Sequence, residues 1–139
     1  MKFGLLGTGN WGKHYVRLLP EYGELVVMNR SIDPTVDCVI IATPAETHFE
    51  YIKKALREGK HILVEKPMVL SVKEAEQVKS LIGNKVFMVA HQYCYNSLIS
   101  SLDIGKLKYI SWTHLYKNSK GNMFWENSTH LFSVMDILN

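Results

Sequence analysis

The chain has 139 residues, of which 47% are apolar and 21% are charged, and its formal net charge is +3. This length suits one domain with an appendage, and the apolar fraction is large enough to fill a core. The lysines and arginines are spread along the chain, so charge gives no argument for a nucleic-acid or membrane partner. Cys38 and Cys94 stand outside any Cys/His metal spacing, and we expect neither a disulfide framework nor a metal site. Without a membrane-spanning apolar stretch or a signal-peptide pattern, the expected location is the reducing cytoplasm.

The N-terminal segment joins a short apolar run, residues 3–6, to the glycine turn Gly7-Thr8-Gly9-Asn10-Trp11-Gly12. Helical spacing of apolar residues follows, at Trp11, Tyr15, Leu18, Leu19 and Tyr22. A strand, a G-x-G-x-x-G turn and a helix in this order predict a dinucleotide site. Gly7 would permit the tight turn, Gly9 would let the backbone approach a pyrophosphate, and Gly12 would let the helix pack close to the strand. The N–H groups at the helix start would face the anion. The alternative is a glycine turn without a ligand.

Residues 24–28 predict a second strand, and Asp33-Pro34 marks a turn after it. Residues 38–42 form a continuous apolar run, which is typical of a parallel strand buried on both faces. Too few residues separate these strands for the crossover helix that a complete two-halved nucleotide fold has at this point. We therefore expect an abbreviated sheet.

The turn after the second strand should meet the adenosine ribose of a bound dinucleotide. A carboxylate there would bind the 2′-OH of NAD, whereas an arginine accommodates the 2′-phosphate of NADP. The chain has Asn29-Arg30-Ser31, which offers a guanidinium and a hydroxyl but no acid. This favours NADP over NAD, with a solvated turn residue as the alternative role of Arg30.

Thr43-Pro44-Ala45-Glu46 predicts a helix start, with Thr43 as N-cap, Pro44 at the first helical position and Glu46 closing a capping box. The helix should end at Gly59, and its apolar face carries Phe49, Ile52, Ala55 and Leu56. A strand at residues 61–64 leads into Glu65-Lys66-Pro67.

Ser71 and Glu74 form a second predicted capping box, and residues 86–90 predict a further buried strand. The helix between them has an apolar face of Val72, Ala75, Val78 and Ile82. Strands thus alternate with helices through short connections, which predicts an α/β fold with a doubly wound parallel sheet, a Rossmann-type dinucleotide-binding domain over residues 1–92.

The pattern changes in residues 93–139. A helix is expected from Tyr93 to Leu102, broken by Gly105, and a long strand over residues 107–116. Residues 117–122 are a polar loop. A final helix begins at about Met123, and its apolar face holds Leu131, Val134, Met135 and Leu138.

Three blocks of this sequence together resemble the glucose–fructose oxidoreductase/inositol dehydrogenase (Gfo/Idh/MocA) family. They are the glycine turn at residues 7–12, the run Val39-Ile40-Ile41-Ala42-Thr43-Pro44 with His48, and the run Gly59-Lys60-His61-Ile62-Leu63-Val64-Glu65-Lys66-Pro67. The resemblance covers most of residues 1–90 and continues more weakly to the end. It implies an NAD(P)-dependent oxidoreductase that oxidises a sugar or polyol hydroxyl or reduces the corresponding ketone.

The resemblance also implies catalytic roles. The lysine of Glu-Lys-Pro lies beside the nicotinamide and the substrate in this family, usually with a cis Lys-Pro bond, and Lys66 matches it. An ammonium there can polarise the carbonyl or alkoxide that exchanges the hydride. Glu126 and His130 match a helical acid and a histidine four residues on, so His130 would be the general acid/base and Glu126 would orient it. The alternatives are an exposed lysine after a strand and a surface Glu–His pair.

Further residues are implied near the cofactor, namely Thr43, Pro44, His48, Glu65 and Gln92. His48 is expected to be structural or close to the cofactor and not catalytic. Two positions depart from the family: Glu126 stands where Asp is usual, and Cys94 stands where many relatives carry an arginine.

Family members continue with a large antiparallel sheet after the catalytic helix, whereas this sequence stops at Asn139. Residues 93–139 are therefore expected to be a truncated substrate and catalytic segment, the remnant of an α+β domain. Two functions stay open: a compact active oxidoreductase, or a non-catalytic NAD(P)-binding remnant or subunit that needs a partner chain. The apolar face that truncation would expose predicts a homo-oligomer.

Overall fold

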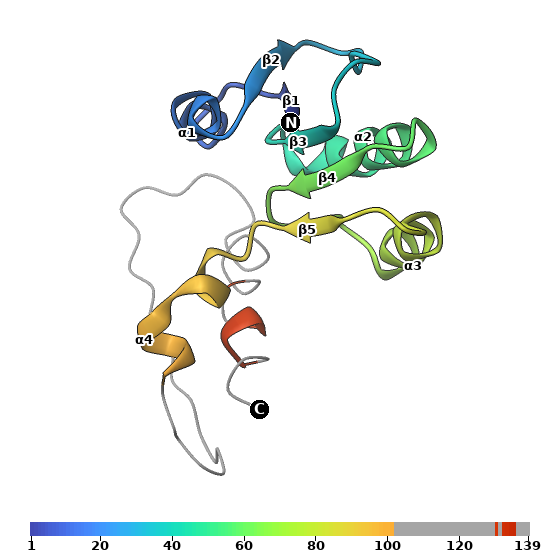
Figure 1. Ribbon diagram of the computed structural model, residues 1–139. Coiled ribbons are helices and arrows are strands. Elements are labelled where there is room, and N and C mark those ends of the chain that lie inside the picture. Colours follow the sequence, from blue (N-terminus) through green and yellow to red (C-terminus); the bar gives the residue numbers. More distant parts are fainter. Residues whose placement is uncertain (102–129, 131, 136–139) are drawn as a thin grey trace. The chain divides into compact units, whose positions relative to one another are not determined.

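A computed structural model describes residues 1–101, 130 and 132–135 of the chain (Figure 1). The chain divides into two compact units, Met1–Ala90 and His91–Asn139. The first unit contains a five-stranded parallel sheet, and each unit is described by itself below. No helix in the described ranges is long and apolar enough to cross a bilayer.

The sheet of the first unit has the strand order β2-β1-β3-β4-β5. All neighbouring strands are parallel, and the elements are β1 (Lys2–Leu6), β2 (Glu24–Met28), β3 (Cys38–Ile41), β4 (His61–Val64) and β5 (Phe87–Val89). The helices are α1 (Gly12–Leu18), continued by the 3-10 turn η1 (Leu19–Glu21), α2 (Ala45–Arg57) and α3 (Val72–Leu81). The chain passes from β1 through α1 to β2 on one side of β1, and from β3 through α2 to β4 and through α3 to β5 on the other side. Because the two series of crossovers run in opposite directions along the sheet, α1 covers one face while α2 and α3 cover the other (Figure 1). The predicted doubly wound parallel sheet is confirmed.

The core lies between the sheet and helices α2 and α3. Alternate strand residues point to this side, because successive side chains of a strand face opposite ways. In register, Leu6 pairs with Met28 and Ile41, and Ile41 pairs with Val64. The buried apolar cluster also includes Val39, Ile52, Ala55, Leu56, Ile62 and Val78.

The connection from β2 to β3 is a short irregular segment, residues 29–37. Its Ile32 and Val36 are 7% and 2% exposed and belong to the core cluster, so they cover the sheet where a crossover helix would otherwise pack. The turn is held by Asp33, whose Oδ1 accepts hydrogen bonds from the N–H and hydroxyl of Thr35 at 2.8 and 2.6 Å. These bonds lower the pKa of Asp33. The predicted abbreviation of the sheet is confirmed in the described part of the chain.

Helix α3 begins as predicted, because Ser71 Oγ accepts the N–H of Glu74 at 3.3 Å. Helix α2 does not begin as predicted. Its N-cap is Pro44 and no side chain caps it, so the predicted capping box from Thr43 is wrong. Pro44 has the extended backbone angles φ −58° and ψ 143°, so the helix begins one residue later. Thr43 Oγ1 instead accepts a hydrogen bond from the hydroxyl of Thr47 at 2.7 Å.

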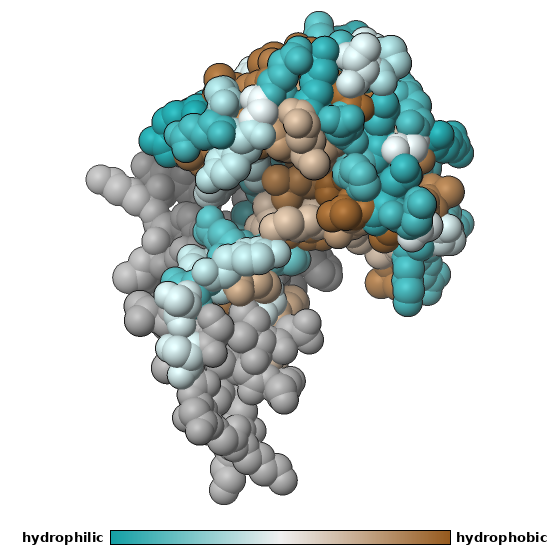
Figure 2. Space-filling view, viewed as in Figure 1, coloured by the Kyte–Doolittle hydropathy of each residue, from teal (hydrophilic) through white to brown (hydrophobic). Residues whose placement is uncertain are grey.

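The predicted apolar faces of α1 and α3 are only partly buried. Trp11, Leu18 and Tyr22 are 48%, 43% and 72% exposed, and Val72 is 76% exposed. Figure 2 shows apolar residues lying among hydrophilic ones on the surface of the first unit. Val72 is the first residue of α3, and α1 is only seven residues long, so neither helix buries the whole of its predicted stripe.

The second unit contains η2 (Gln92–Tyr95) and α4 (Ser97–Ser100) within its described residues. The predicted single helix from Tyr93 is therefore wrong there. The chain is interrupted at Asn96, which has ψ 112° and whose Oδ1 accepts the N–H of Ile99 at 3.4 Å. Residues 130 and 132–135 are helical, as predicted, and Val134 is buried. The predictions for residues 102–129, Leu131 and Leu138 lie outside the described residues.

Candidate functional site

The glycine turn after β1 has the geometry that a pyrophosphate site requires. Gly7 has φ +91°, and a Cβ there would lie 2.5 Å from the carbonyl oxygen of Ala42. A Cβ on Gly12 would collide with the carbonyl oxygen of Gly7, so any larger residue would push α1 away from the strand. At Gly9 an added Cβ meets nothing within 4 Å, which leaves this backbone open to a ligand. The residues therefore fit a dinucleotide as the sequence predicts.

This turn lies where the strand order of the sheet reverses. β1 pairs with β2 on one side and with β3 on the other, and Ala42 donates its N–H to the carbonyl of Leu6 at 2.8 Å. Ligands of open α/β sheets bind outside the carboxyl ends of the strands at such a switch point. The segments that follow β2, β3 and β4 begin at this same edge. The parallel sheet therefore gathers at the glycine turn the residues Asn29-Arg30-Ser31, Thr43-Pro44 and Glu65-Lys66-Pro67.

The turn after β4 has a buried carboxylate and a half-buried lysine. Glu65 is 9% exposed, and the Lys66–Pro67 peptide bond is cis, as the family resemblance implies. Glu65 Oε1 accepts the hydroxyl of Tyr15 at 2.8 Å, and Oε2 accepts the backbone N–H of Lys66 at 3.3 Å. Burial, and then the negative charge of Glu65, raise the pKa of Tyr15 well above its usual range.

His48 lies beneath this edge at 1% exposure. Its Nδ1 is 2.8 Å from the carbonyl oxygen of Pro67, and its Nε2 is 2.8 Å from that of Thr43. A neutral imidazole has one N–H and donates to one of these carbonyls, whereas a protonated ring donates to both. Either way His48 joins the turn after β3 to the turn after β4.

The exposed cofactor-side residues lie at two places. Thr8, Asn10 and Trp11 are exposed on the glycine turn, and Asn29, Arg30 and Ser31 are exposed at the end of β2. In a doubly wound sheet the tip of this strand faces the adenosine ribose. The guanidinium of Arg30 is therefore accessible to a 2′-phosphate.

The second unit contains the remaining predicted site residues. His130 is 5% exposed, and its ring packs edge-to-face against Tyr93 with 5.0 Å between centroids. The hydroxyl of Ser133 donates to the carbonyl of His130 at 2.8 Å. Gln92 is exposed in η2. Glu126 lies outside the described residues, and so does its predicted pairing with His130.

Sequence reasoning missed the role of Tyr15. Its spacing places it on the apolar side of α1, and the structure shows its hydroxyl on Glu65. A usable signal was available, because a tyrosine on a buried helix face needs a polar partner for its hydroxyl. The identity of that partner depends on the sheet, in which only β3 separates β4 from β1, the strand that α1 follows.

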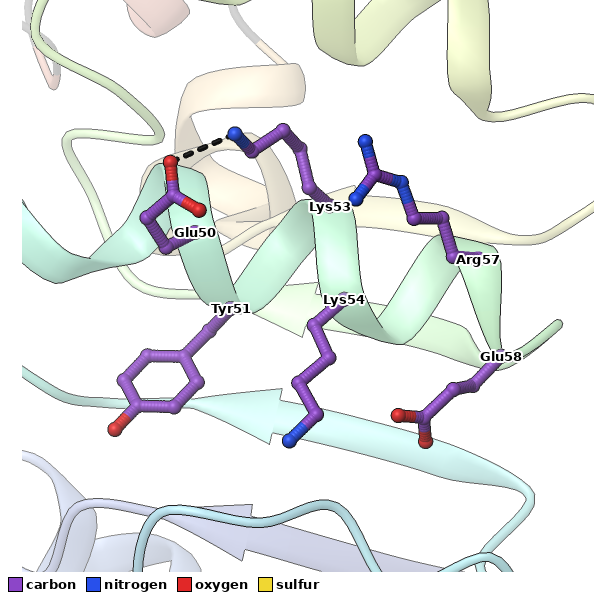
Figure 3. A pocket seen from close by; sticks show the side chains of 6 residues that line it. All are labelled: Glu50, Tyr51, Lys53, Lys54, Arg57 and Glu58. Carbon is purple, nitrogen blue, oxygen red and sulfur yellow. Dashed lines mark ion pairs between the residues drawn. The ribbon is translucent and has the colours of Figure 1, made fainter.

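A separate hollow of about 400 Å³ runs along α2 (Figure 3). Lys53 there forms a 2.7 Å ion pair with Glu50 and lies 4.3 Å from the ring centroid of Phe49. The lining residues are Glu50, Tyr51, Lys53, Lys54, Arg57 and Glu58. These residues lie on the C-terminal part of α2 and at its C-cap, whereas Thr43 and His48 lie at its N-terminal end. All six lining residues come from one segment, at α2 and its C-cap, so this hollow is not where the ends of the strands meet.

Comparison with known proteins agrees with this geometry. Residues 19–93, more than half of the chain, match a protein family described as "Oxidoreductase family, NAD-binding Rossmann fold" and designated GFO_IDH_MocA. A Bacillus subtilis scyllo-inositol 2-dehydrogenase (NAD(+)) is 40% identical over 81 residues, which are 54% of this chain and 24% of the relative. The B. subtilis scyllo-inositol 2-dehydrogenase (NADP(+)) IolW is 36% identical over 53 residues, 38% of this chain and 15% of the relative.

A solved structure of a putative oxidoreductase from Klebsiella pneumoniae superimposes with a TM-score of 0.61. The two are 25% identical, and the match covers 71% of this chain and 37% of that one. The chain thus spans about a quarter or less of the length of the two dehydrogenases from B. subtilis.

Proposed function

The chain belongs to the Gfo/Idh/MocA family of oxidoreductases, whose Rossmann fold binds NAD, and on this premise we propose that it transfers a hydride between a nicotinamide dinucleotide and a sugar or polyol hydroxyl. The observation that carries the proposal is the shared edge of the sheet. There, an open glycine turn for the pyrophosphate and the Glu65-Lys66-Pro67 turn lie at the ends of strands separated only by β3. Relatives named as scyllo-inositol dehydrogenases support a polyol as substrate.

In this function Gly9 leaves room for the pyrophosphate, and Arg30 at the tip of β2 binds the 2′-phosphate of NADP. The bound nicotinamide supplies the hydride acceptor or donor. Lys66 places its ammonium beside the reacting oxygen and stabilises negative charge on it as the carbon–hydrogen bond breaks or forms. His130 exchanges the hydroxyl proton as general acid/base, oriented by Glu126, and Gln92 contacts the nicotinamide side. Thr43 and Pro44, which follow β3, line the cofactor site.

Two titrations and one assay test the proposal. NADPH and NADH are titrated separately into the full chain, followed by cofactor fluorescence, and turnover is then measured with scyllo-inositol and myo-inositol. We expect micromolar binding, and turnover that Lys66→Met reduces at least about a hundredfold because a preorganised charge is lost. Lys79→Met, an exposed lysine on α3, is the matched control and should leave both unchanged.

The outcomes separate the enzyme from its alternative. Cofactor binding without turnover of any polyol, unaffected by Lys66→Met, would instead identify a non-catalytic NAD(P)-binding subunit that needs a partner chain. Failure to bind either dinucleotide would overturn both functions.

We also propose that the chain self-associates. The support is the exposed apolar surface of α1, where Val16 and Leu18 are 39% and 43% exposed. Sedimentation at micromolar concentration should show a homo-oligomer that Leu18→Glu weakens. A monomeric wild-type chain would refute self-association and leave the hydride-transfer proposal intact.

A further inference from the structure

Tyr15 connects two segments of the site that lie 50 residues apart in the chain. Its half-buried ring is on α1, one turn after Gly12, and its hydroxyl donates a 2.8 Å hydrogen bond to Glu65 Oε1. This distance is ordinary for an O–H···O bond, and the carboxylate acceptor makes it stronger than a bond between neutral groups. The helix that begins at the pyrophosphate turn is thereby tied to the turn that carries Lys66.

The Glu65 carboxylate is held at both oxygens. Oε1 accepts from Tyr15, while Oε2 accepts the backbone N–H of Lys66 at 3.3 Å. The main chain of Glu65 is held too, because its N–H donates to the carbonyl of Ile41 at 2.9 Å. At 9% exposure, little water can replace a lost donor. One carboxylate thus bonds both to the hydroxyl of Tyr15 and to the backbone of Lys66.

We propose that Tyr15 is a positioning residue of this site, which fixes the Glu65 carboxylate and, through it, the backbone from which Lys66 reaches the nicotinamide and substrate. The proposal rests on the function proposed above for Lys66. Without the phenol, the carboxylate can turn toward other donors, among them the ammonium of Lys66 next to it in the chain. Lys66 would then hold its charge in a different place during hydride transfer.

The ionisation of Tyr15 suits this role. A phenol of ordinary pKa is already a donor at neutral pH. Burial and the charge of Glu65 raise the pKa of Tyr15 well above its usual range, so it remains a donor in alkaline solution as well. A second tyrosine offers a matched comparison: Tyr51 on α2 is also half-buried, and it lines the hollow along that helix.

The test compares Tyr15→Phe with Tyr51→Phe in the full chain. Each change removes one hydroxyl and keeps the ring. The first measurement is amide hydrogen exchange of Lys66 without cofactor, the second is the Kd for NADPH, and the third is kcat with scyllo-inositol at saturating NADP. Thermal unfolding verifies that both variants fold.

For Tyr15→Phe we expect Lys66 exchange to accelerate about tenfold and kcat to fall about tenfold, as loss of a hydrogen bond to a charged group implies. The Kd for NADPH should stay within about twofold, because the glycine turn is intact. Tyr51→Phe should change none of these. The proposal would be overturned if Tyr15→Phe had the same Lys66 exchange rate and the same kcat as the wild-type chain. Equal effects of Tyr15→Phe and Tyr51→Phe would overturn it as well.

The exchange measurement is independent of turnover. If the wild-type chain turns over no polyol, the proposed function fails, while faster exchange at Lys66 in Tyr15→Phe alone still supports the positioning by Tyr15. Glu65→Gln gives a second variant in case Tyr15→Phe folds poorly. Because Tyr15 acts through Glu65, the double variant should exchange no faster at Lys66 than Glu65→Gln alone, and additive effects would contradict the proposal.

Discussion

His48 and Pro67 are joined by a contact of 2.8 Å between the ring Nδ1 and the carbonyl oxygen, and Nε2 of the same ring lies equally close to the carbonyl of Thr43. A single buried imidazole therefore connects the ends of β3 and β4 at the edge where the cofactor is proposed to bind. The backbone of both turns depends on a side chain from the first turn of α2.

Replacing His48 by leucine should destabilise the fold. The change keeps a side chain of similar size but leaves at least one buried carbonyl without its donor, which costs about 1–3 kcal/mol. Urea unfolding should show this loss in the free energy of unfolding. His14→Leu, on the exposed side of α1, is the control and should have little effect. Equal stabilities of the two variants would exclude the proposed role of His48.

Alanine at Gly9 and at Gly12 should have opposite consequences. At Gly9 the added methyl meets nothing within 4 Å, so thermal stability should hold while NADPH affinity falls at least about tenfold, because the methyl occupies the space of the pyrophosphate. At Gly12 the methyl collides with the Gly7 carbonyl, so the melting temperature itself should fall. Differential scanning calorimetry and cofactor titration measure the two effects. Unchanged NADPH affinity in Gly9→Ala would argue against this binding mode.

Arg30→Ala should distinguish the two dinucleotides. Removing a phosphate-binding guanidinium should weaken NADPH binding about tenfold or more and leave NADH binding unchanged. Isothermal titration with each cofactor measures the difference. Arg57→Ala, an exposed arginine at the end of α2, controls for net charge. A wild-type chain that prefers NADH would contradict the assignment of Arg30.

Cys38 should make stability fall in alkaline solution. Burial raises the pKa of its thiol from 9.0 to about 11, with the charge of Asp37 adding to the rise and a backbone hydrogen bond from Leu63 opposing it. Above pH 9 the unfolded chain releases this proton while the folded chain retains it. The free energy of unfolding should therefore decrease as pH rises from about 9 to 11, and stay unaffected by this group below pH 9.

Urea unfolding at pH 8 and pH 10 measures this change. Cys38→Ala should show a smaller decrease than the wild-type chain, because the thiol no longer contributes. An identical pH dependence in the two proteins would mean that Cys38 is as accessible to solvent in the folded state as in the unfolded one.

The local patterns predict most of the elements of the first unit, because each depends on neighbouring residues. The five strands follow from apolar runs between turn residues, and the Ser71 cap follows from hydroxyl chemistry at the start of α3. Prediction fails where a residue has a competing partner. Thr43 does not cap α2, because Pro44 extends the chain and the Thr43 hydroxyl bonds to Thr47.

By itself, the amino-acid sequence determines the order of strands and helices, the glycine turn and the family, because apolar period, backbone freedom and motif spacing are local properties. Only the tertiary structure decides which side chains meet across that order. The hydroxyl of Tyr15 on Glu65 and the ring of His48 between Thr43 and Pro67 depend on parallel strands bringing distant turns to one edge. Such contacts leave no periodic trace in the sequence, since each joins residues whose proximity is created by the sheet.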